Sequence, residues 1–129
     1  MLPNDPLHIL VVEDERDLQA IFAELLPYFD LTADAAMNAN EALQLLSQNR
    51  YAGAIIDLGL PGMDGLELIK MIRSQPATRN MPCVAVTAWH GSGVKQTALA
   101  AGFNAYFSKP FEPETFVQEL RRIIFKPAA

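Results

Sequence analysis

The chain has 129 residues, 50% of them hydrophobic, and its 10 Lys and Arg residues stand against 15 Asp and Glu residues, which gives a net charge of −5. This length suits a single domain, residues 1–129 with a core over about 7–125, and no apolar run approaches the roughly 18 residues of a membrane helix. The acidic balance disfavours a nucleic-acid surface, and a lone cysteine without a signal-peptide pattern favours the cytoplasm.

Five short apolar segments predict β-strands. They cover residues 7–12, 31–36, 52–58, 82–87 and 105–107. Most of these segments are continuous apolar runs and lack a strict alternation of polar and apolar residues. Runs of this kind are typical of parallel strands that are buried on both faces of a sheet.

Each strand is followed by a segment with apolar residues at helical spacing, which predicts five helices. Asp14 is expected to cap the first helix, and Asn38 with Glu41 forms a capping-box pattern for the second. Gly102 is expected to end the fourth helix, and the last begins near Pro113. The alternation predicts the α/β class, with a doubly wound, five-stranded parallel sheet covered by helices on both faces.

Polar residues stand where four of the predicted strands end. Glu13 and Asp14 follow the first strand, Asp57 ends the third, Thr87 ends the fourth and Lys109 follows the fifth. The carboxyl ends of parallel strands meet at one edge, where doubly wound sheets place their sites. Taken singly, each residue has a plainer interpretation as a helix cap, a turn residue, a strand residue or a surface charge.

Three carboxylates that converge at one sheet edge repel each other unless a cation lies among them. Oxygen ligands without Cys or His favour a hard ion, and few carboxylates with room for water and phosphate favour Mg²⁺ over Ca²⁺. A lysine and a hydroxyl beside that ion would complete a site for a phosphoryl group. A carboxylate is a competent nucleophile for such a group.

Four segments together resemble the receiver domain of two-component response regulators. They are Asp-Leu-Gly-Leu-Pro-Gly-Met-Asp-Gly at 57–65, the pair Glu13-Asp14, the pair Thr87-Ala88, and Ser-Lys-Pro-Phe at 108–111. The resemblance covers about residues 7–125. It implies a flavodoxin-like, CheY-like fold with the strand order 2-1-3-4-5.

The resemblance also implies the roles of the acidic residues. Asp57 is the expected phosphoacceptor. Glu13, Asp14 and Asp57, together with the main-chain carbonyl of Gly59, are the expected ligands of Mg²⁺ as cofactor.

The remaining roles concern the opposite side of the same site. The resemblance implies that Thr87 and Lys109 receive phosphoryl oxygens, that Thr87 and Tyr106 form the switch, and that the Lys109–Pro110 peptide is cis. The general frequency of cis X-Pro bonds in folded proteins is only about 5%, so the last expectation rests on the resemblance alone.

Two positions depart from the family pattern. Gly59 lies two residues after Asp57, where the family often has a larger residue, and Trp89 lies two residues after Thr87. We expect both positions to tune the lifetime of the phosphoryl group. Gly59 offers no side chain to screen attacking water, whereas the indole of Trp89 could cover the group; the alternative is that Trp89 anchors its own loop.

The chain is therefore expected to be a signalling switch that catalyses its own phosphoryl transfer and autodephosphorylation, not a metabolic enzyme. Expected partners are a histidine kinase or phosphotransfer protein, a downstream protein on the face of the fourth helix, fifth strand and fifth helix, and a second copy in a phosphorylation-dependent homodimer. No contact with nucleic acid or membrane is expected. The sequence favours either a single-domain regulator or a receiver from a longer chain.

Two other classes share part of this pattern. A haloacid-dehalogenase-like phosphatase also combines an Asp nucleophile with Mg²⁺, but it expects a second Asp where this chain has Gly59. A flavodoxin-like FMN carrier needs a phosphate-binding loop after the first strand, where the acidic run at 13–15 would repel phosphate. Turnover of simple phosphate esters would favour the first class, and a yellow colour on purification the second.

A few remaining residues have weaker claims to function. Cys83 lies within a predicted strand and is expected to be a buried hydrophobe, and His8 is expected to be structural. The role of His90 stays open. The basic end of the last helix, with Arg121, Arg122 and Lys126, is expected to complement the helix dipole.

Overall fold

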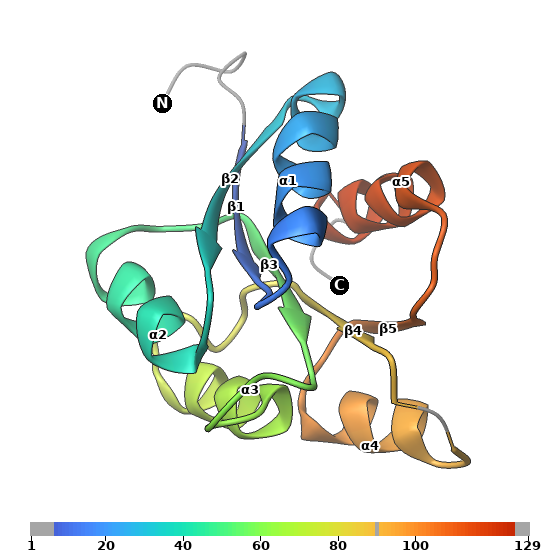
Figure 1. Cartoon of the computed structure of the whole chain (residues 1–129). Helices are drawn as coiled ribbons and strands as arrows, with labels where there is room; N and C mark the ends of the chain where they lie inside the picture. The colour runs from blue at the N-terminus through green and yellow to red at the C-terminus, as the bar shows by residue number, and fades with distance from the viewer. Residues whose placement is uncertain (1–6, 90, 126–129) are drawn as a thin grey trace.

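The computed structural model describes residues 7–89 and 91–125, so that His90 and Lys126 lie outside the described residues. Five parallel strands form one sheet in the order β2-β1-β3-β4-β5 (Figure 1). Their bounds are β1 (Leu7–Val12), β2 (Leu31–Ala36), β3 (Gly53–Asp57), β4 (Cys83–Thr87) and β5 (Ala105–Ser108). The expected fold class and strand order are both confirmed.

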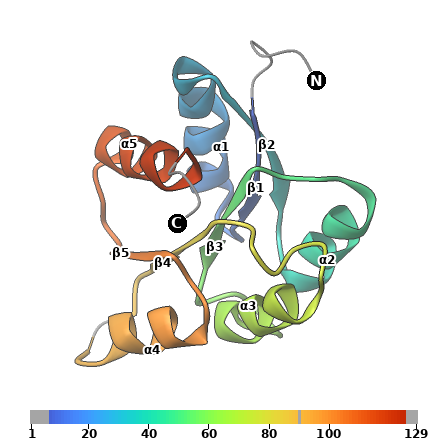
Figure 2. The same ribbon diagram turned by 180° about the vertical axis from the view of Figure 1, so that it is seen from behind.

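Five α-helices cover the two faces of the sheet. They are α1 (Arg16–Leu25), α2 (Ala39–Gln48), α3 (Gly65–Ser74), α4 (Val94–Ala101) and α5 (Pro113–Ile124). Helices α1 and α5 lie on one face and α2, α3 and α4 on the other (Figures 1 and 2). A 3-10 helix over Leu26–Phe29, which we did not expect, extends α1. No helix in the described ranges has the length and apolar character needed to span a bilayer.

The sheet is buried on both sides, which explains the apolar character of the strands. In β1, Ile9 and Val11 pack with Phe22 of α1 in the layer of α1 and α5. Leu10 and Val12 belong to the layer of α2, α3 and α4. Burying each aliphatic side chain of this size contributes about 1.5–3 kcal/mol, so the central strands form a rigid support. Cys83 is fully buried in this core, as expected.

Helix caps follow the sequence at most positions but not at α1. The Asn38 side chain accepts a hydrogen bond from the Glu41 amide at 2.9 Å, and Gly102 follows α4 with a φ of 128°, as predicted. The N-cap of α1 is Glu15, without a side-chain cap, so the expectation that Asp14 caps this helix is wrong. The reason is that the Asp14 carboxylate lies beside Glu13 and Asp57, where it belongs to a different cluster.

The start of α3 packs tightly against the end of β3. A Cβ at Gly65 would lie 2.6 Å from the main-chain oxygen of Asp57 and 2.8 Å from Cα of Leu58, closer than such atoms approach. The Gly65 amide donates to the Leu58 carbonyl at 3.0 Å. Glycine at this position therefore lets the β3–α3 turn close and fixes the loop that carries Gly59 next to Asp57.

A second polar cluster joins β1, β2 and the segment before β3. We call it the His8 cluster; its residues are His8, Thr32, Asp34 and Tyr51. His8 Nδ1 lies 2.5 Å from Thr32 Oγ1, and His8 Nε2 lies 2.9 Å from Asp34 Oδ2. The Tyr51 hydroxyl donates to the same Asp34 oxygen at 2.7 Å, and the rings of Tyr51 and His8 stack with centroids 5.4 Å apart. These contacts agree with the structural role expected for His8.

Candidate functional site

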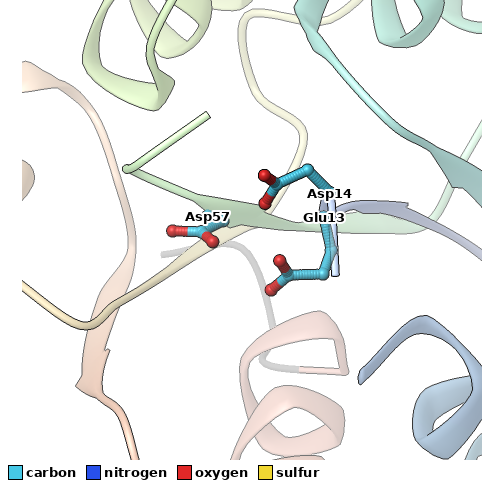
Figure 3. Close-up of side chains that lie close together, drawn as sticks. All are labelled: Glu13, Asp14 and Asp57. Carbon is cyan, nitrogen blue, oxygen red and sulfur yellow. The ribbon is translucent and has the colours of Figure 1, made fainter. Parts of the chain in front are cut away.

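Three carboxylates converge at the carboxyl edge of the sheet, as the sequence predicted. Figure 3 shows Glu13 and Asp14 after β1 and Asp57 at the end of β3, with their carboxylates directed toward one another. One oxygen from each residue lies within 4.8 Å of the others. Glu13 and Asp57 are only 1% and 5% exposed, whereas Asp14 is exposed to solvent. We call these three residues, with Lys109, the carboxylate site.

Lys109 supplies the cation that the acidic residues need. Its Nζ lies 2.9 Å from both Glu13 Oε1 and Asp57 Oδ2, and 3.8 Å from Glu15 Oε1. The peptide between Lys109 and Pro110 is cis, as expected. One ammonium group thus bridges two buried carboxylates, which leaves the carboxylate site with an excess of negative charge.

The unequal charge balance affects the protonation of the buried groups. Burial raises the pKa of Glu13 to about 7, and the nearby Asp57 adds to this rise, while the hydrogen bond from Lys109 opposes it. Burial alone would lower the pKa of Lys109, but its hydrogen bonds to Glu13 and Asp57 hold that pKa above the usual value. The ammonium therefore stays charged, and the site has affinity for further positive charge, including a proton.

The Asp57 carboxylate is oriented by two donors on different elements. Its Oδ1 accepts a hydrogen bond from the Gly59 amide at 2.9 Å, and its Oδ2 accepts from Lys109 Nζ. A Cβ at Gly59 would lie 3.3 Å from the indole nitrogen of Trp89 and 3.6 Å from Asp57 Oδ1. The Trp89 indole, 40% exposed, therefore borders the Asp57 carboxylate across the open space at Gly59.

Thr87 and Tyr106 lie on neighbouring strands beyond this carboxylate. Thr87 is fully buried, and its hydroxyl accepts a hydrogen bond from the Trp89 amide at 2.9 Å. Tyr106 is half-buried and packs against the core layer of α2, α3 and α4. Among the described residues, neither side chain is hydrogen-bonded to Asp57. The carboxylate site is therefore assembled, while the two expected switch residues lie outside its contacts.

Two residues contribute to the site that the sequence did not single out. The Glu15 amide donates to Glu13 Oε2 at 3.1 Å, and the Gln19 side chain donates to the Glu13 carbonyl. Glu15 follows the acidic pair directly, and Gln19 lies one helical turn further on in α1. A search for polar side chains one turn into the helix after the acidic pair could have found Gln19.

The site offers the donors that Mg²⁺ prefers. Three carboxylate groups supply only oxygen ligands, and the exposed position of Asp14 leaves one side open to water. The excess negative charge around Lys109 gives a cation a strong electrostatic reason to bind. The doubly wound sheet makes the chain a flavodoxin-like domain. The carboxylate site at the carboxyl edge of this sheet is an acidic pocket compatible with Mg²⁺ and with phosphorylation of an Asp.

Comparison with known proteins specifies the family. Residues 9–121 match the family model of the response regulator receiver domain. The chain belongs to this family, and it is thus a receiver domain of two-component signalling. This membership favours the receiver interpretation over both the phosphatase and the flavin carrier.

Named relatives agree with the family. The chain is 34% identical over 122 residues to a chemotaxis protein CheY homolog of Campylobacter jejuni, covering 92% of each chain. It is 38% identical over 118 residues to the two-component response regulator PhoP of Pseudomonas aeruginosa, covering 92% of this chain and 52% of PhoP, about half its length. The receiver domain of sensor histidine kinase PA1611 from Pseudomonas aeruginosa has a similar structure, with a TM-score of 0.83 and 29% identity over 92% of this chain and 98% of that one.

Proposed function

We propose that Asp57 is the phosphoacceptor of this domain and that Mg²⁺ is its cofactor, held by Glu13, Asp14, Asp57 and the main-chain carbonyl of Gly59. The observation that carries the proposal is the position of Lys109, whose ammonium bridges Glu13 and Asp57 at 2.9 Å inside an acidic cluster. The related PA1611 receiver domain has a magnesium ion coordinated in its active-site cleft, which supports the choice of metal.

In the proposed reaction, an Asp57 oxygen forms a bond to the phosphorus of a phosphohistidine. The bond from phosphorus to the imidazole nitrogen breaks, and that nitrogen takes up a proton. Mg²⁺, when bound, neutralises part of the charge that carboxylates and phosphoryl group bring together. Gly59 orients the Asp57 carboxylate through its amide, and Lys109 is placed to pair with a phosphoryl oxygen.

The switch is proposed to act through Thr87 and Tyr106. A phosphoryl group on Asp57 adds acceptor oxygens and nearly two negative charges, which attract the Thr87 hydroxyl. That hydroxyl then moves away from the Trp89 amide, its present partner at 2.9 Å. Tyr106, half-buried beside α4, can fill the vacated space with its ring. A shift from 1:99 to 99:1 requires about 5.5 kcal/mol of differential affinity.

The proposed partners follow from membership in two-component signalling. A histidine kinase or phosphotransfer protein donates the phosphoryl group, and a downstream protein binds the face of α4, β5 and α5. Leu99 of α4, 40% exposed, gives this face an apolar contact for that protein or for a second copy in a phosphorylated homodimer. We place the protein in the cytoplasm, with residues 1–129 as one receiver domain.

Phosphorylation is tested by intact mass after incubation with acetyl phosphate and Mg²⁺. We expect one phosphoryl group on the wild type, none on Asp57→Asn and almost none in EDTA. Asp64→Asn is the matched control, because Asp64 lies in the same 57–65 segment but caps α3. Single phosphorylation of Asp57→Asn, or full labelling in EDTA, would overturn the assignment.

The switch is tested separately by NMR with beryllofluoride and Mg²⁺, which mimic the phosphoryl state. We expect shift changes to extend from Asp57 to Ala88, Trp89 and Tyr106 and onward through α4. Changes confined to the carboxylate site, with one Tyr106 rotamer throughout, would show that the domain is phosphorylated without using this switch.

A further inference from the structure

A groove runs between the C-terminal halves of α2 and α3, at the sheet edge opposite the carboxylate site. It consists of two adjoining hollows of about 390 Å³ and 540 Å³. Leu46, Ser47, Ala77 and Thr78 line both hollows, which makes them one groove. Figure 2 shows the α3–β4 segment, in yellow, passing beside α2 at this place. The volumes are typical of ligand sites, which range over roughly 300–1,000 Å³.

The two halves of the groove differ in chemistry. The first hollow lies between the helices and is lined largely by aliphatic side chains of Leu43, Leu46, Met71 and Ile72. Met71 is 39% exposed there, so its side chain offers apolar surface to a ligand. The second hollow lies between the α2–β3 and α3–β4 loops and is lined by polar groups that include Gln48, Arg50 and Asn80.

The polar half has a positive charge in a protein whose net charge is −5. In the part of the chain that the structure describes, no Asp or Glu lines either hollow. Arg50 is the charged residue among those that line the groove. Within 7–89 and 91–125, Arg50 has no carboxylate at ion-pair distance. Its guanidinium group is thus available to a ligand.

Helix ends could cancel this charge, because the carbonyls of a last turn carry partial negative charge. Two of those carbonyls already have donors that reduce their exposure to a ligand. The Leu45 carbonyl accepts from the Asn49 amide and side chain at 2.9 and 3.1 Å. The Ile72 carbonyl accepts from the Thr78 hydroxyl at 2.7 Å. Arg50 therefore remains the charged side chain that a ligand meets in the polar half.

We propose that this groove binds a small amphipathic carboxylate, with its apolar body between α2 and α3 and its carboxylate head at Arg50 and Asn80. The two-part lining fits such a ligand, because the body removes Met71 and Leu46 from water while the head pairs with a guanidinium. The site lies at the opposite edge from Asp57 and involves none of the phosphorylation residues. Its ligand binds whether or not the proposed phosphorylation occurs.

The test uses three probes with one apolar body and different heads: 4-phenylbutyrate, 4-phenylbutanol and 4-phenylbutylamine. Each is titrated into ¹⁵N-labelled protein and followed by amide shifts. We expect 4-phenylbutyrate to shift residues 46–51 and 76–81 saturably, with a dissociation constant on the order of 1 mM. The alcohol should bind about threefold to fivefold more weakly, and the amine more weakly still.

Variants separate the two halves of the groove. Arg50→Gln should reduce the affinity for 4-phenylbutyrate to that of the alcohol and leave the alcohol unchanged, whereas Met71→Gln should weaken both. Arg122→Gln, an exposed arginine that pairs with Glu119 on α5, is the control and should change nothing. Equal binding of the three probes, shifts centred elsewhere, or an unchanged Arg50→Gln variant would overturn the proposal. Asp57→Asn should bind like the wild type, which keeps this result independent of phosphorylation.

Discussion

The carboxylate site and the His8 cluster are both small polar clusters at the sheet, but they differ in charge balance. The carboxylate site places three carboxylates around one ammonium, and two of those carboxylates are buried. The His8 cluster has one carboxylate, Asp34, whose side chain is 38% exposed and which contacts both His8 and Tyr51. The first cluster has more buried negative charge than its ammonium neutralises, while the second has one partly exposed carboxylate that hydrogen-bonded neighbours stabilise.

The pKa values of the carboxyl groups in the two clusters shift in opposite directions. Burial raises the pKa of Glu13 to about 7, whereas the hydrogen bond from Tyr51 holds the pKa of Asp34 below its usual value. The hydrogen bonds of the second cluster stabilise the charged carboxylate that it contains. A cluster with uncompensated buried charge destabilises the isolated domain and favours the arrival of a cation. Perturbed groups of this kind mark functional sites, so charge balance separates the two clusters.

We expect the largest effect on stability from the removal of the Lys109 ammonium. Lys109→Met removes the only ammonium at two buried carboxylates, so the free energy of unfolding at pH 8 without Mg²⁺ should fall by about 3–5 kcal/mol. Urea denaturation followed by circular dichroism measures it. Lys95→Met on the exposed side of α4 should change this free energy by less than about 0.5 kcal/mol.

A double variant keeps this prediction testable if Lys109→Met fails to fold. Adding Glu13→Gln removes one of the two unpaired charges and should restore a cooperative transition. If the single variant is as stable as the wild type, Lys109 does not compensate the carboxylates and the contrast between the clusters is wrong.

The next largest effect is expected in the pH dependence of the free energy of unfolding, which reports the contribution of Glu13. The pKa of Glu13 rises from 4.5 to about 7 on folding, so between these values the folded chain binds more protons than the unfolded chain. The free energy of unfolding should therefore fall as pH rises through this window, by up to about 3 kcal/mol from this group. Glu13→Gln should lack this contribution, whereas parallel curves for variant and wild type would show that Glu13 titrates normally.

The fold was predictable because its rules are local and periodic. The ranges expected for the first two strands match β1 and β2 residue for residue, although only β1 is a largely apolar run and β2, with Thr32 and Asp34, was the weaker prediction. The 3-10 helix over Leu26–Phe29 was missed, because a single turn is too short to show a periodic apolar pattern, although Pro27 suits its first turn. Asp14 was misjudged as a cap, because functional clustering overrode the capping preference.

Of the carboxylate site, the sequence could predict only those features that follow from the topology of the sheet. Parallel strands bring the residues at their carboxyl ends together, so Glu13, Asp57 and Lys109 were placed correctly. The contact between Gly59 and Trp89 joins two loops whose conformations no periodicity specifies. The His8 cluster was also missed, although its pairing of His8 with Thr32 follows from the register of β1 and β2. Tyr51 joins it from a loop, which sequence spacing does not locate.

A smaller effect is expected from Trp89, the aromatic residue that borders the carboxylate site. Trp89→Ala should speed loss of the phosphoryl group by about threefold to tenfold, because the indole lies beside the Asp57 carboxylate and limits access of water. Decay of the phosphorylated mass after removal of the phosphodonor measures the rate. Trp89→Phe retains a ring and should change the rate less. An unchanged rate in Trp89→Ala would show that the indole only anchors its loop.

The smallest effect is expected in the His8 cluster. Tyr51→Phe removes one hydrogen bond to Asp34 and should lower the free energy of unfolding by about 0.5–1 kcal/mol at pH 7, a modest value because the Asp34 carboxylate is partly exposed. Tyr28→Phe, whose side chain is 85% exposed, is the matched control and should have no measurable effect.

The pH dependence of this effect has the opposite sign to that of Glu13. The pKa of Asp34 is lowered in the folded state from 3.8, so its contribution to stability is complete above that value and is lost as pH falls through the folded pKa. The difference between wild type and Tyr51→Phe should therefore shrink below about pH 4. Phosphorylation of Asp57 should proceed normally in Tyr51→Phe; a change would mean that the two clusters are coupled through β1, and their separation into functional and structural groups would not hold.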